Sequence, residues 1–338
     1  MLDKLIVCYD TLPRGVHMDD GKLKQVKAFH KGASKYMQVI SGKLSDVQKY
    51  EHEKPGYFVW NYNNTRRILD SKQISLKRRF FLDSDILVSY PEDGYSNLAS
   101  DKKYVRVLNR HFDDRKVNYF LDNVSFDQNR WDKIAQDKGI TLKEDYTLDG
   151  DSIIVFLNRG KSGYTGGNMD PSEFAIMMIS WIRENSKRPI IIRFHPYGKN
   201  KKQIQDSVKK YPQLTMGQVK AVLDYCKSNN IKDVTVQHKY KDGHWTNLLE
   251  EVSKCYACVT YGSSSAAPAI IEGKPLFVIG EGCFFHDMSV GNLSSIENVT
   301  ITNDYHEKRK NFLTKYIHTH YTTEELRQGL YWEKIYAI

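Results

Sequence analysis

Three consecutive serines, Ser263 to Ser265, follow Gly262 between two apolar segments. Residues 258–261 are mostly β-branched or aromatic, which is typical of a buried strand, and residues 266–271 suit a short helix. A strand, turn and helix in this order direct backbone N–H groups and hydroxyls towards the positive end of a helix dipole, which favours a bound phosphate. A serine that only caps the helix is the alternative, although one serine would suffice for that. We predict an anion site at Gly262, Ser263, Ser264 and Ser265.

A second candidate site follows the apolar segment 189–193. Arg193 ends this predicted strand, and His195 and Pro196 come directly after it. A histidine beyond the carboxyl end of a strand could donate to a phosphate oxygen or protonate a leaving group. Arg193 could clamp a phosphate through its guanidinium group. A loop histidine with no part in any chemistry is the alternative interpretation.

A third candidate is the glycine-rich segment 156–170, FLNRGKSGYTGGNMD, which suggests a strand, a loop and the start of a helix. It does not fit the phosphate loop of nucleoside triphosphatases, because Val155 stands where the first glycine belongs. Arg159 and Lys161 could still surround a diphosphate or an acceptor, and a surface loop without a ligand is the alternative. Three anion-binding turns on one sheet predict a nucleotide. A sugar nucleotide held by backbone dipoles and cations needs no metal.

Transfer of a sugar also needs a base that takes the proton from the acceptor hydroxyl. Glu92 and Asp93 follow the apolar segment 86–90, and two adjacent carboxylates raise the pKa of one of the pair. Asp20 belongs to a second acid-acid-glycine triplet at the start of a predicted helix, and Asp10 ends the first predicted strand. The sequence leaves the choice among Asp93, Asp20 and Asp10 open.

Two patterns resemble metal sites but have simpler explanations. Asp83 and Asp85 match a metal-binding DxD pattern, yet they link two apolar segments, where a turn explains them. His318 and His320 have no further ligand at a suitable spacing. We therefore predict no metal and no cofactor, only a nucleotide-sugar co-substrate that is UDP- or CMP-linked.

Strands alternate with helices along the chain, which predicts parallel sheets covered on both faces. The polar segment 143–151 predicts a linker. We expect an α/β protein with two Rossmann-like domains that face a central cleft at the carboxyl ends of their strands. The N-terminal domain, residues 1–150, would bind the acceptor, and the C-terminal domain, residues 151–338, the nucleotide sugar. Two helix starts carry capping patterns: Asp170 with Pro171 and Glu173, and Thr322 with Glu325.

Composition narrows the class of protein. The 338 residues are 40% hydrophobic and 27% charged, which is typical of a soluble globular chain. We find no apolar run near the roughly 18 residues that a membrane span needs, and no secretory signal. Five cysteines, among them a lone CxxC pair, predict reduced thiols and a cytoplasmic location. The net charge of +9 is compatible with binding DNA or an acidic membrane surface.

Taken in chain order, Glu92-Asp93-Gly94, His195-Pro196 and Ser263-Ser264 resemble motifs of GT-B-fold glycosyltransferases, the group of bacterial sialyltransferases and their Kdo- and capsule-building relatives. The resemblance implies that Asp93 is the general base and that His195, Ser263 and Ser264 contact the donor phosphate. Such enzymes often carry a ribose-binding glutamate near the position of Pro268, and Glu272 is the predicted substitute.

Segments of residues 152–280, including TYGSSSAAPAIIEGKPLF and RPIIIRFHP, also resemble glycosyltransferase-like proteins of T-even-type phages. We therefore predict a metal-independent, inverting glycosyltransferase that acts in the host cytoplasm. It would move a sugar onto a hydroxylated base, such as hydroxymethylcytosine, in double-stranded phage DNA, with the target base flipped out of the duplex. Sialyl or Kdo transfer to a cell-surface glycan and a non-catalytic nucleotide- or DNA-binding protein are the alternatives.

Overall fold

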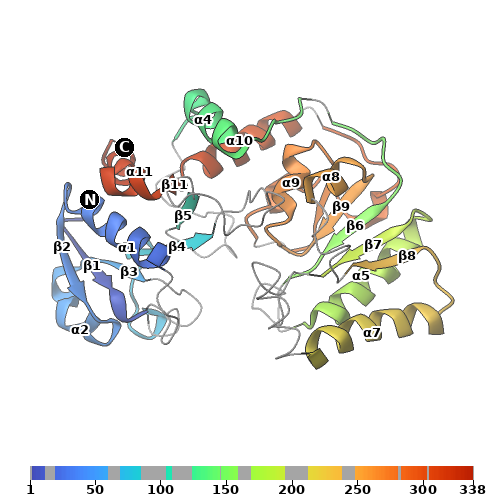
Figure 1. Ribbon diagram of the computed structural model, residues 1–338, viewed down its shortest axis with the longest axis horizontal. Coiled ribbons are helices and arrows are strands. Elements are labelled where there is room, and N and C mark those ends of the chain that lie inside the picture. The colour runs from blue at the N-terminus through green and yellow to red at the C-terminus, as the bar shows by residue number, and fades with distance from the viewer. Residues whose placement is uncertain are drawn as a thin grey trace. The chain divides into compact units, whose positions relative to one another are not determined.

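The chain forms two compact α/β units in a computed structural model (Figure 1). The structure describes residues 2–11, 20–59, 69–84, 104–108, 124–144, 146–158, 169–194, 212–237, 248–280, 283–302 and 304–337. Unit 1 comprises Met1–Asp85, Leu98–Asp137 and Leu313–Ile338, and unit 2 comprises Ile86–Asn97 and Lys138–Phe312. Each unit is described on its own below.

Unit 1 is built on a six-stranded sheet in the order β11-β5-β4-β3-β1-β2. Strands β1, β2, β3 and β4 run parallel, and β5 and β11 continue the sheet in antiparallel pairs. Every residue of β3 and β5 is buried, because helices cover the sheet on both faces. The strands are β1 (Lys4–Cys8), β2 (Gln38–Gly42), β3 (Gly56–Val59), β4 (Arg79–Ser84), β5 (Tyr104–Leu108) and β11 (His320–Thr322). The α-helices are α1 (Asp20–Ala33), α2 (Val47–Tyr50), α4 (Gln128–Lys138), α11 (Thr323–Gln328) and α12 (Leu330–Tyr336).

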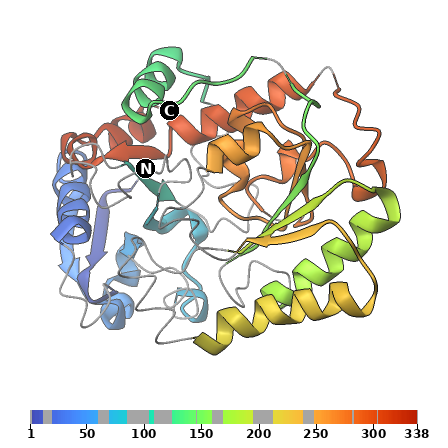
Figure 2. The same ribbon diagram turned by 45° about the vertical axis from the view of Figure 1, so that its right-hand side comes forward.

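Unit 2 is built on a five-stranded, wholly parallel sheet in the order β10-β9-β6-β7-β8. Helices α5 and α7 cover one face, and α8 and α9 cover the other (Figures 1 and 2). The strands are β6 (Ile153–Phe156), β7 (Ile190–Arg193), β8 (Val234–Gln237), β9 (Ala257–Thr260) and β10 (Leu276–Val278). The α-helices are α5 (Pro171–Asn185), α7 (Pro212–Ser228), α8 (Leu248–Ser253), α9 (Ala266–Ile271) and α10 (Tyr305–Ile317), the last of which crosses into unit 1. The predicted class, α/β with two Rossmann-like domains, is confirmed.

Both predicted capping patterns are present. At the start of α5 the Asp170 carboxylate accepts from the Ser172 N–H, 2.9 Å, and the Glu173 carboxylate accepts from the Asp170 N–H, 2.8 Å. At the start of α11 the Thr322 hydroxyl and the Glu325 carboxylate form the same reciprocal pair. These local bonds satisfy N–H groups that have no partner inside the helix, so their sequence signature predicts the helix start.

The boundaries between the units do not coincide with the predicted domain boundary between residues 150 and 151. The segment after α4 belongs to unit 2, because the Lys143 N–H donates to the Ile271 carbonyl, 2.9 Å, and the Arg309 guanidinium donates to the Lys143 carbonyl, 2.7 Å. The predicted linker, residues 143–151, is therefore part of unit 2, to which Lys143, Thr147 and Asp149 are hydrogen-bonded. Residues 313–338 belong to unit 1 rather than to the C-terminal domain, since β11 pairs with β5.

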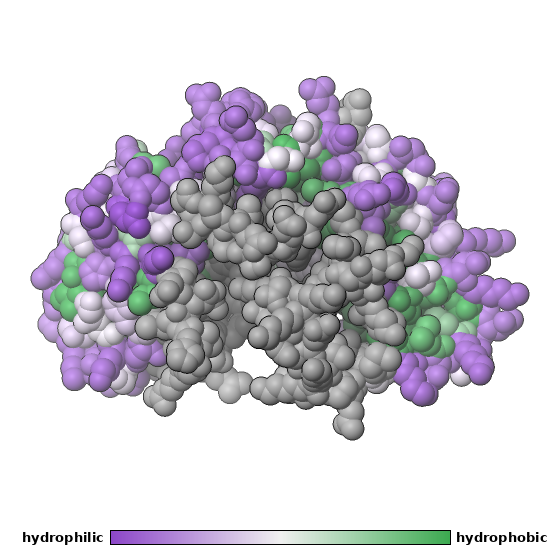
Figure 3. Space-filling model, in the orientation of Figure 1, coloured by the Kyte–Doolittle hydropathy of each residue, from purple (hydrophilic) through white to green (hydrophobic). Residues whose placement is uncertain are grey.

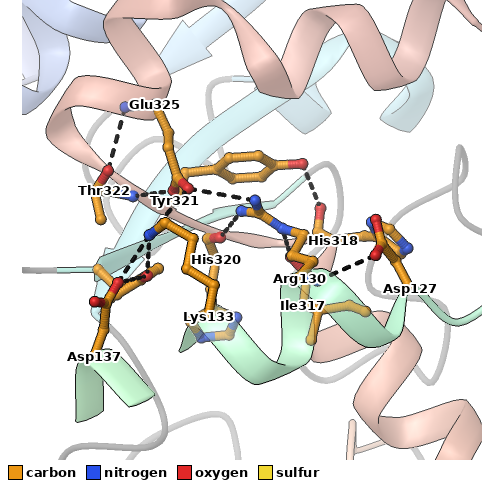
Figure 4. Close-up of polar contacts among 11 residues, drawn as sticks. Asp127, Arg130, Lys133, Asp137, Ile317, His318, His320, Tyr321, Thr322 and Glu325 are labelled. Carbon is orange, nitrogen blue, oxygen red and sulfur yellow. Dashed lines mark hydrogen bonds and ion pairs between the residues drawn. The ribbon is translucent and has the colours of Figure 1, made fainter. Parts of the chain in front are cut away.

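Arg130 of α4 fastens this C-terminal segment to unit 1 (Figure 4). Its guanidinium donates to the Ile317 and His320 carbonyls, both at 2.6 Å, and lies 3.4 Å from the Glu325 carboxylate. The Ile317 carbonyl belongs to the last residue of α10, so no N–H group inside that helix donates to it. The Arg130 guanidinium supplies the missing hydrogen bond. Arg130 also stacks on the Tyr321 ring, 4.5 Å from its centroid. One half-buried cation thus joins three chain segments.

His318 lies in the same cluster and is 2% exposed. Its Nε2 is 3.1 Å from the Ser125 carbonyl, which can only accept, so Nε2 carries the proton. Burial, more than any nearby charge, lowers the pKa of His318 from its ordinary 6.5 to about 4. At pH values between about 4 and 6.5, this imidazole is therefore neutral in the folded protein and protonated in the unfolded chain.

This difference predicts a loss of stability in mild acid. Between pH 6.5 and about 4 the unfolded chain binds a proton at His318 that the folded protein does not, so the free energy of unfolding falls as the pH falls. We expect His318→Gln, which keeps a donor for Ser125, to remove up to about 3 kcal/mol of this pH dependence in urea titrations. Substitution of the exposed His306 by Gln is the matched control. Parallel pH profiles for His318→Gln and the wild type would contradict the assignment.

Candidate functional site

The strand order of unit 2 reverses between two neighbouring strands. From β6 the chain adds β7 and β8 on one side, and then returns to add β9 and β10 on the other. Strands β6 and β9 are paired from Ile153 with Ala257 to Phe156 with Thr260. Helices α5 and α9, which follow them, lie on opposite faces of the sheet (Figures 1 and 2). Outside the carboxyl ends of such a strand pair lies the usual ligand site of an open α/β sheet.

The serine turn follows β9 at this place. The Thr260 hydroxyl accepts from the Gly262 N–H, 3.2 Å, and the Ser263 N–H, 2.9 Å. The same hydroxyl lies 3.4 Å from the Phe156 carbonyl of β6, to which it donates. A Cβ on Gly262 would lie 2.9 Å from the Cys283 Cβ, so a side chain there would displace the 283 segment. One buried threonine thus ties the turn to the ends of both strands.

The serines of the turn differ in their surroundings. Ser263 is buried and its hydroxyl accepts from the Ser265 N–H, 3.3 Å, whereas Ser264 is exposed and Ser265 is half-buried. Ser265 precedes α9 but makes no side-chain capping bond, so the simple capping interpretation does not describe it. Within the described part of the chain, the N–H and hydroxyl of Ser264 have no hydrogen-bond partner. These two donors are open to a ligand.

Asn158 lies on the other side of the strand pair, two residues beyond the end of β6. Its Nδ2 is buried, yet no hydrogen-bond acceptor among the described residues reaches it. A buried amide donor without a partner is unusual in a folded protein. The sequence analysis singled out the glycine-rich loop that starts here but missed Asn158. A polar residue directly after a wholly buried strand is the signal that would have found it.

Arg193 is the last residue of β7 and is aligned with Phe156 of β6 on one side and with Gln237 of β8 on the other. Its guanidinium forms a buried ion pair with the Glu251 carboxylate of α8 and lies 3.3 Å from the Gln237 side-chain oxygen. Gln237 in turn donates to Glu251, 3.2 Å. The Arg193 charge is therefore balanced inside the protein, and its predicted contact with a phosphate stays a prediction.

Glu272 lies at the end of α9 opposite to the serine turn. Burial raises the pKa of its carboxyl group, while nearby Lys143 and Lys274 lower it. The adjacent Ile271 and Gly273 carbonyls accept from the 143–147 segment, so Glu272 stands at the amino-terminal edge of the strands. The structure does not bring Glu272 together with the serines.

Several other predicted residues lie outside the described part of the chain, namely Glu92, Asp93, Arg159, Lys161 and His195. Asp20 is the first residue of α1. Asp10 lies two residues beyond β1, in a short 3-10 helix (Tyr9–Thr11). The neighbours of β1 are β2 and β3, so Asp10 stands where the strand order of unit 1 also reverses. It is exposed, and its carboxylate accepts from the Leu44 N–H at 3.0 and 3.1 Å.

No group of three or more histidine, cysteine or acidic side chains in the described ranges is arranged to hold a metal ion. The CxxC pair, Cys255 and Cys258, has its sulfur atoms 3.5 Å apart and wholly buried. Burial raises the pKa of Cys258, which keeps it a thiol and makes it a poor nucleophile. All five cysteines are buried and none is in a disulfide, so the predicted burial of Cys8, Cys226 and Cys258 is confirmed.

The described helices include none that is long and apolar enough to cross a membrane. In the view of Figure 3 most of the coloured surface is hydrophilic. The large apolar side chains exposed by more than a third, among those described, are Leu148, Trp181, Leu223 and Ile301.

Comparison with known proteins identifies the fold. No protein-family model and no curated protein sequence matches the chain. Among solved structures, the beta Kdo 2,7 transferase of KpsC from Thermosulfurimonas dismutans matches with a TM-score of 0.50 and 11% identity, over 98% of this chain and 99% of that one. The beta Kdo 2,4 transferase of the same KpsC matches with a TM-score of 0.50 and 13% identity, over 93% of this chain and 90% of that one. At these identities the likeness concerns the fold, which is the two-domain GT-B type.

The role of Thr260 predicts a specific loss. Thr260→Val keeps the shape of the side chain but leaves the Gly262 and Ser263 N–H groups without their acceptor. We expect the free energy of unfolding to fall by about 1–3 kcal/mol in urea titrations. Thr260→Ser, which keeps the hydroxyl, should retain most of the stability. Equal stability of the valine and serine variants would show that the hydroxyl does not hold the turn.

The Arg193–Glu251 pair predicts that substitutions of these two residues have strongly non-additive effects on the free energy of unfolding. Glu251→Gln removes the carboxylate that pairs with the buried Arg193 guanidinium, and we expect a loss of about 3 kcal/mol or more in the free energy of unfolding. Replacing both residues by Met removes both charges and should recover most of that loss. A Glu251→Gln variant as stable as the wild type would mean that Arg193 is balanced by another anion.

Proposed function

We propose that this protein is a glycosyltransferase of the Kdo or sialyl type, which moves a sugar from a nucleotide-sugar donor to a hydroxyl group of a glycan. The donor would be CMP-linked, and unit 2 would bind its nucleotide. The main support is the Thr260-held serine turn at the strand-order reversal of unit 2, in a chain whose fold is similar to two Kdo transferases over almost its whole length.

The roles of the residues follow from this proposal. Ser263 and Ser264 would contact the donor phosphate, with His195 donating to a phosphate oxygen as the sequence resemblance implies. Arg159 and Lys161 would add positive charge. A carboxylate would take the proton from the acceptor hydroxyl, with Asp93 implied by the resemblance and Asp10 and Asp20 as the alternatives. Neutralisation of the leaving phosphate by these groups would need no metal ion.

The acceptor we propose differs from the one predicted first. A hydroxylated base in phage DNA receives no support from the comparisons, in which both reported structures are Kdo transferases. The arguments for DNA are the resemblance of residues 152–280 to proteins of T-even-type phages and the net charge of +9, and basic proteins of many other kinds share that charge. A glycan acceptor therefore fits the findings better, and DNA becomes one arm of the test.

The test incubates the protein with CMP-Kdo, CMP-sialic acid or UDP-glucose, together with Kdo-ended glycans or hydroxymethylated duplex DNA. Mass spectrometry of the acceptors and assay of the released nucleotide measure transfer. We expect a CMP-linked sugar to be transferred to a glycan. His195→Ala should reduce the rate by about 100-fold or more, and His306→Ala is its control.

Comparing the rates of Asp93→Asn, Asp10→Asn and Asp20→Asn identifies the base. Product NMR tests the predicted inversion at the anomeric carbon.

Transfer to DNA but not to a glycan would show that the acceptor is the DNA base predicted from the sequence. Absence of both transfer and donor binding with every nucleotide sugar would refute the proposed activity.

A further inference from the structure

We propose that Asn158 is a binding residue for the donor, whose Nδ2–H donates to a phosphate oxygen of the nucleotide sugar; this rests on the proposed function. The first observation is the unpaired donor itself. Nδ2 is shielded from water, and no acceptor among the described residues is within hydrogen-bond distance. A native protein rarely keeps such a group without a ligand, water or catalytic role to explain it.

The second observation is the position of Asn158 in the sheet. It follows the central strand β6, whose partners β7 and β9 align Phe156 with Arg193 and with Thr260. Asn158 therefore stands at the same level beyond the sheet edge as Gly262 of the serine turn. The strand order reverses between these two segments, which is where parallel α/β sheets bind their ligands.

The third observation concerns the chemistry of the neighbouring groups. The cation described at this edge, Arg193, is already paired with Glu251. The described residues leave neutral donors open here, among them the Ser264 N–H and hydroxyl on the β9 side and Asn158 Nδ2 on the β6 side. A carboxamide donates without carrying a charge of its own, and a phosphate oxygen is the most strongly accepting atom of a nucleotide sugar.

A binding residue and a structural asparagine respond oppositely to the same substitution. Asn158→Leu keeps the volume and removes the unpaired donor, so the ligand-free protein should melt at an equal or higher temperature. Its affinity for CMP and for CMP-Kdo should fall by about 10- to 100-fold, since a hydrogen bond to a charged group is lost. Asn158→Asp should weaken binding further through repulsion of the phosphate. The exposed Asn298→Leu is the matched control.

The experiment combines calorimetric titration of CMP and CMP-Kdo, ligand-free melting curves, and the side-chain ¹⁵N–¹H resonances of the wild-type protein. The Asn158 amide resonance, identified by its loss in Asn158→Asp, should shift when CMP binds. Unchanged affinity in both Asn158 variants would overturn the assignment while leaving the proposed function intact. A lower melting temperature of Asn158→Leu without ligand would also overturn it, because it would show a structural role. If the wild type binds neither probe, the proposed function and this assignment fail together.

Discussion

In unit 2 two hydrogen-bonded neighbours, β6 and β9, send their following helices to opposite faces of one sheet, and the rest of the site depends on this arrangement. It leaves the carboxyl ends of both strands without a helix crossing directly over them. The Thr260 hydroxyl then joins the two ends, because it accepts from the turn after β9 and donates to the last carbonyl of β6. A short polar turn can keep a defined shape at this open edge for that reason.

Three buried or half-buried cations among the described residues are paired inside the protein. Arg193 is balanced by Glu251, Lys274 by Asp149 at 2.6 Å, and Arg130 by Glu325 together with two carbonyls. Taking a charge out of water is so unfavourable that each cation needs such partners. At the carboxyl edge of unit 2, the donors left open among the described residues are therefore neutral hydroxyl and amide groups. Neutral donors arranged around one point are a common way to bind a phosphate.

The C-terminal segment shows how long-range packing defines a unit. Trp332 of α12 packs against Phe29 of α1 and Phe80 of β4, with ring centroids 5.3 and 5.1 Å apart. Helix α11 lies along α1, and β11 extends the sheet beside β5. The first and last parts of the chain thus share one hydrophobic core, which burial of apolar surface stabilises.

Local interactions were readable from the sequence, because their physics acts over a few residues. The alternation of strands and helices, both capping boxes and the strand–turn–helix at the three serines all follow from hydrogen bonds and periodicity within short segments. The tertiary structure alone decided which distant groups meet. It pairs Arg193 with Glu251, places Glu272 at the opposite end of α9 from the serines, and returns residues 313–338 to unit 1. It also leaves the Asn158 amide unpaired beside the strand reversal. These outcomes depend on strand order and helix placement, which bring together residues that no sequence spacing relates.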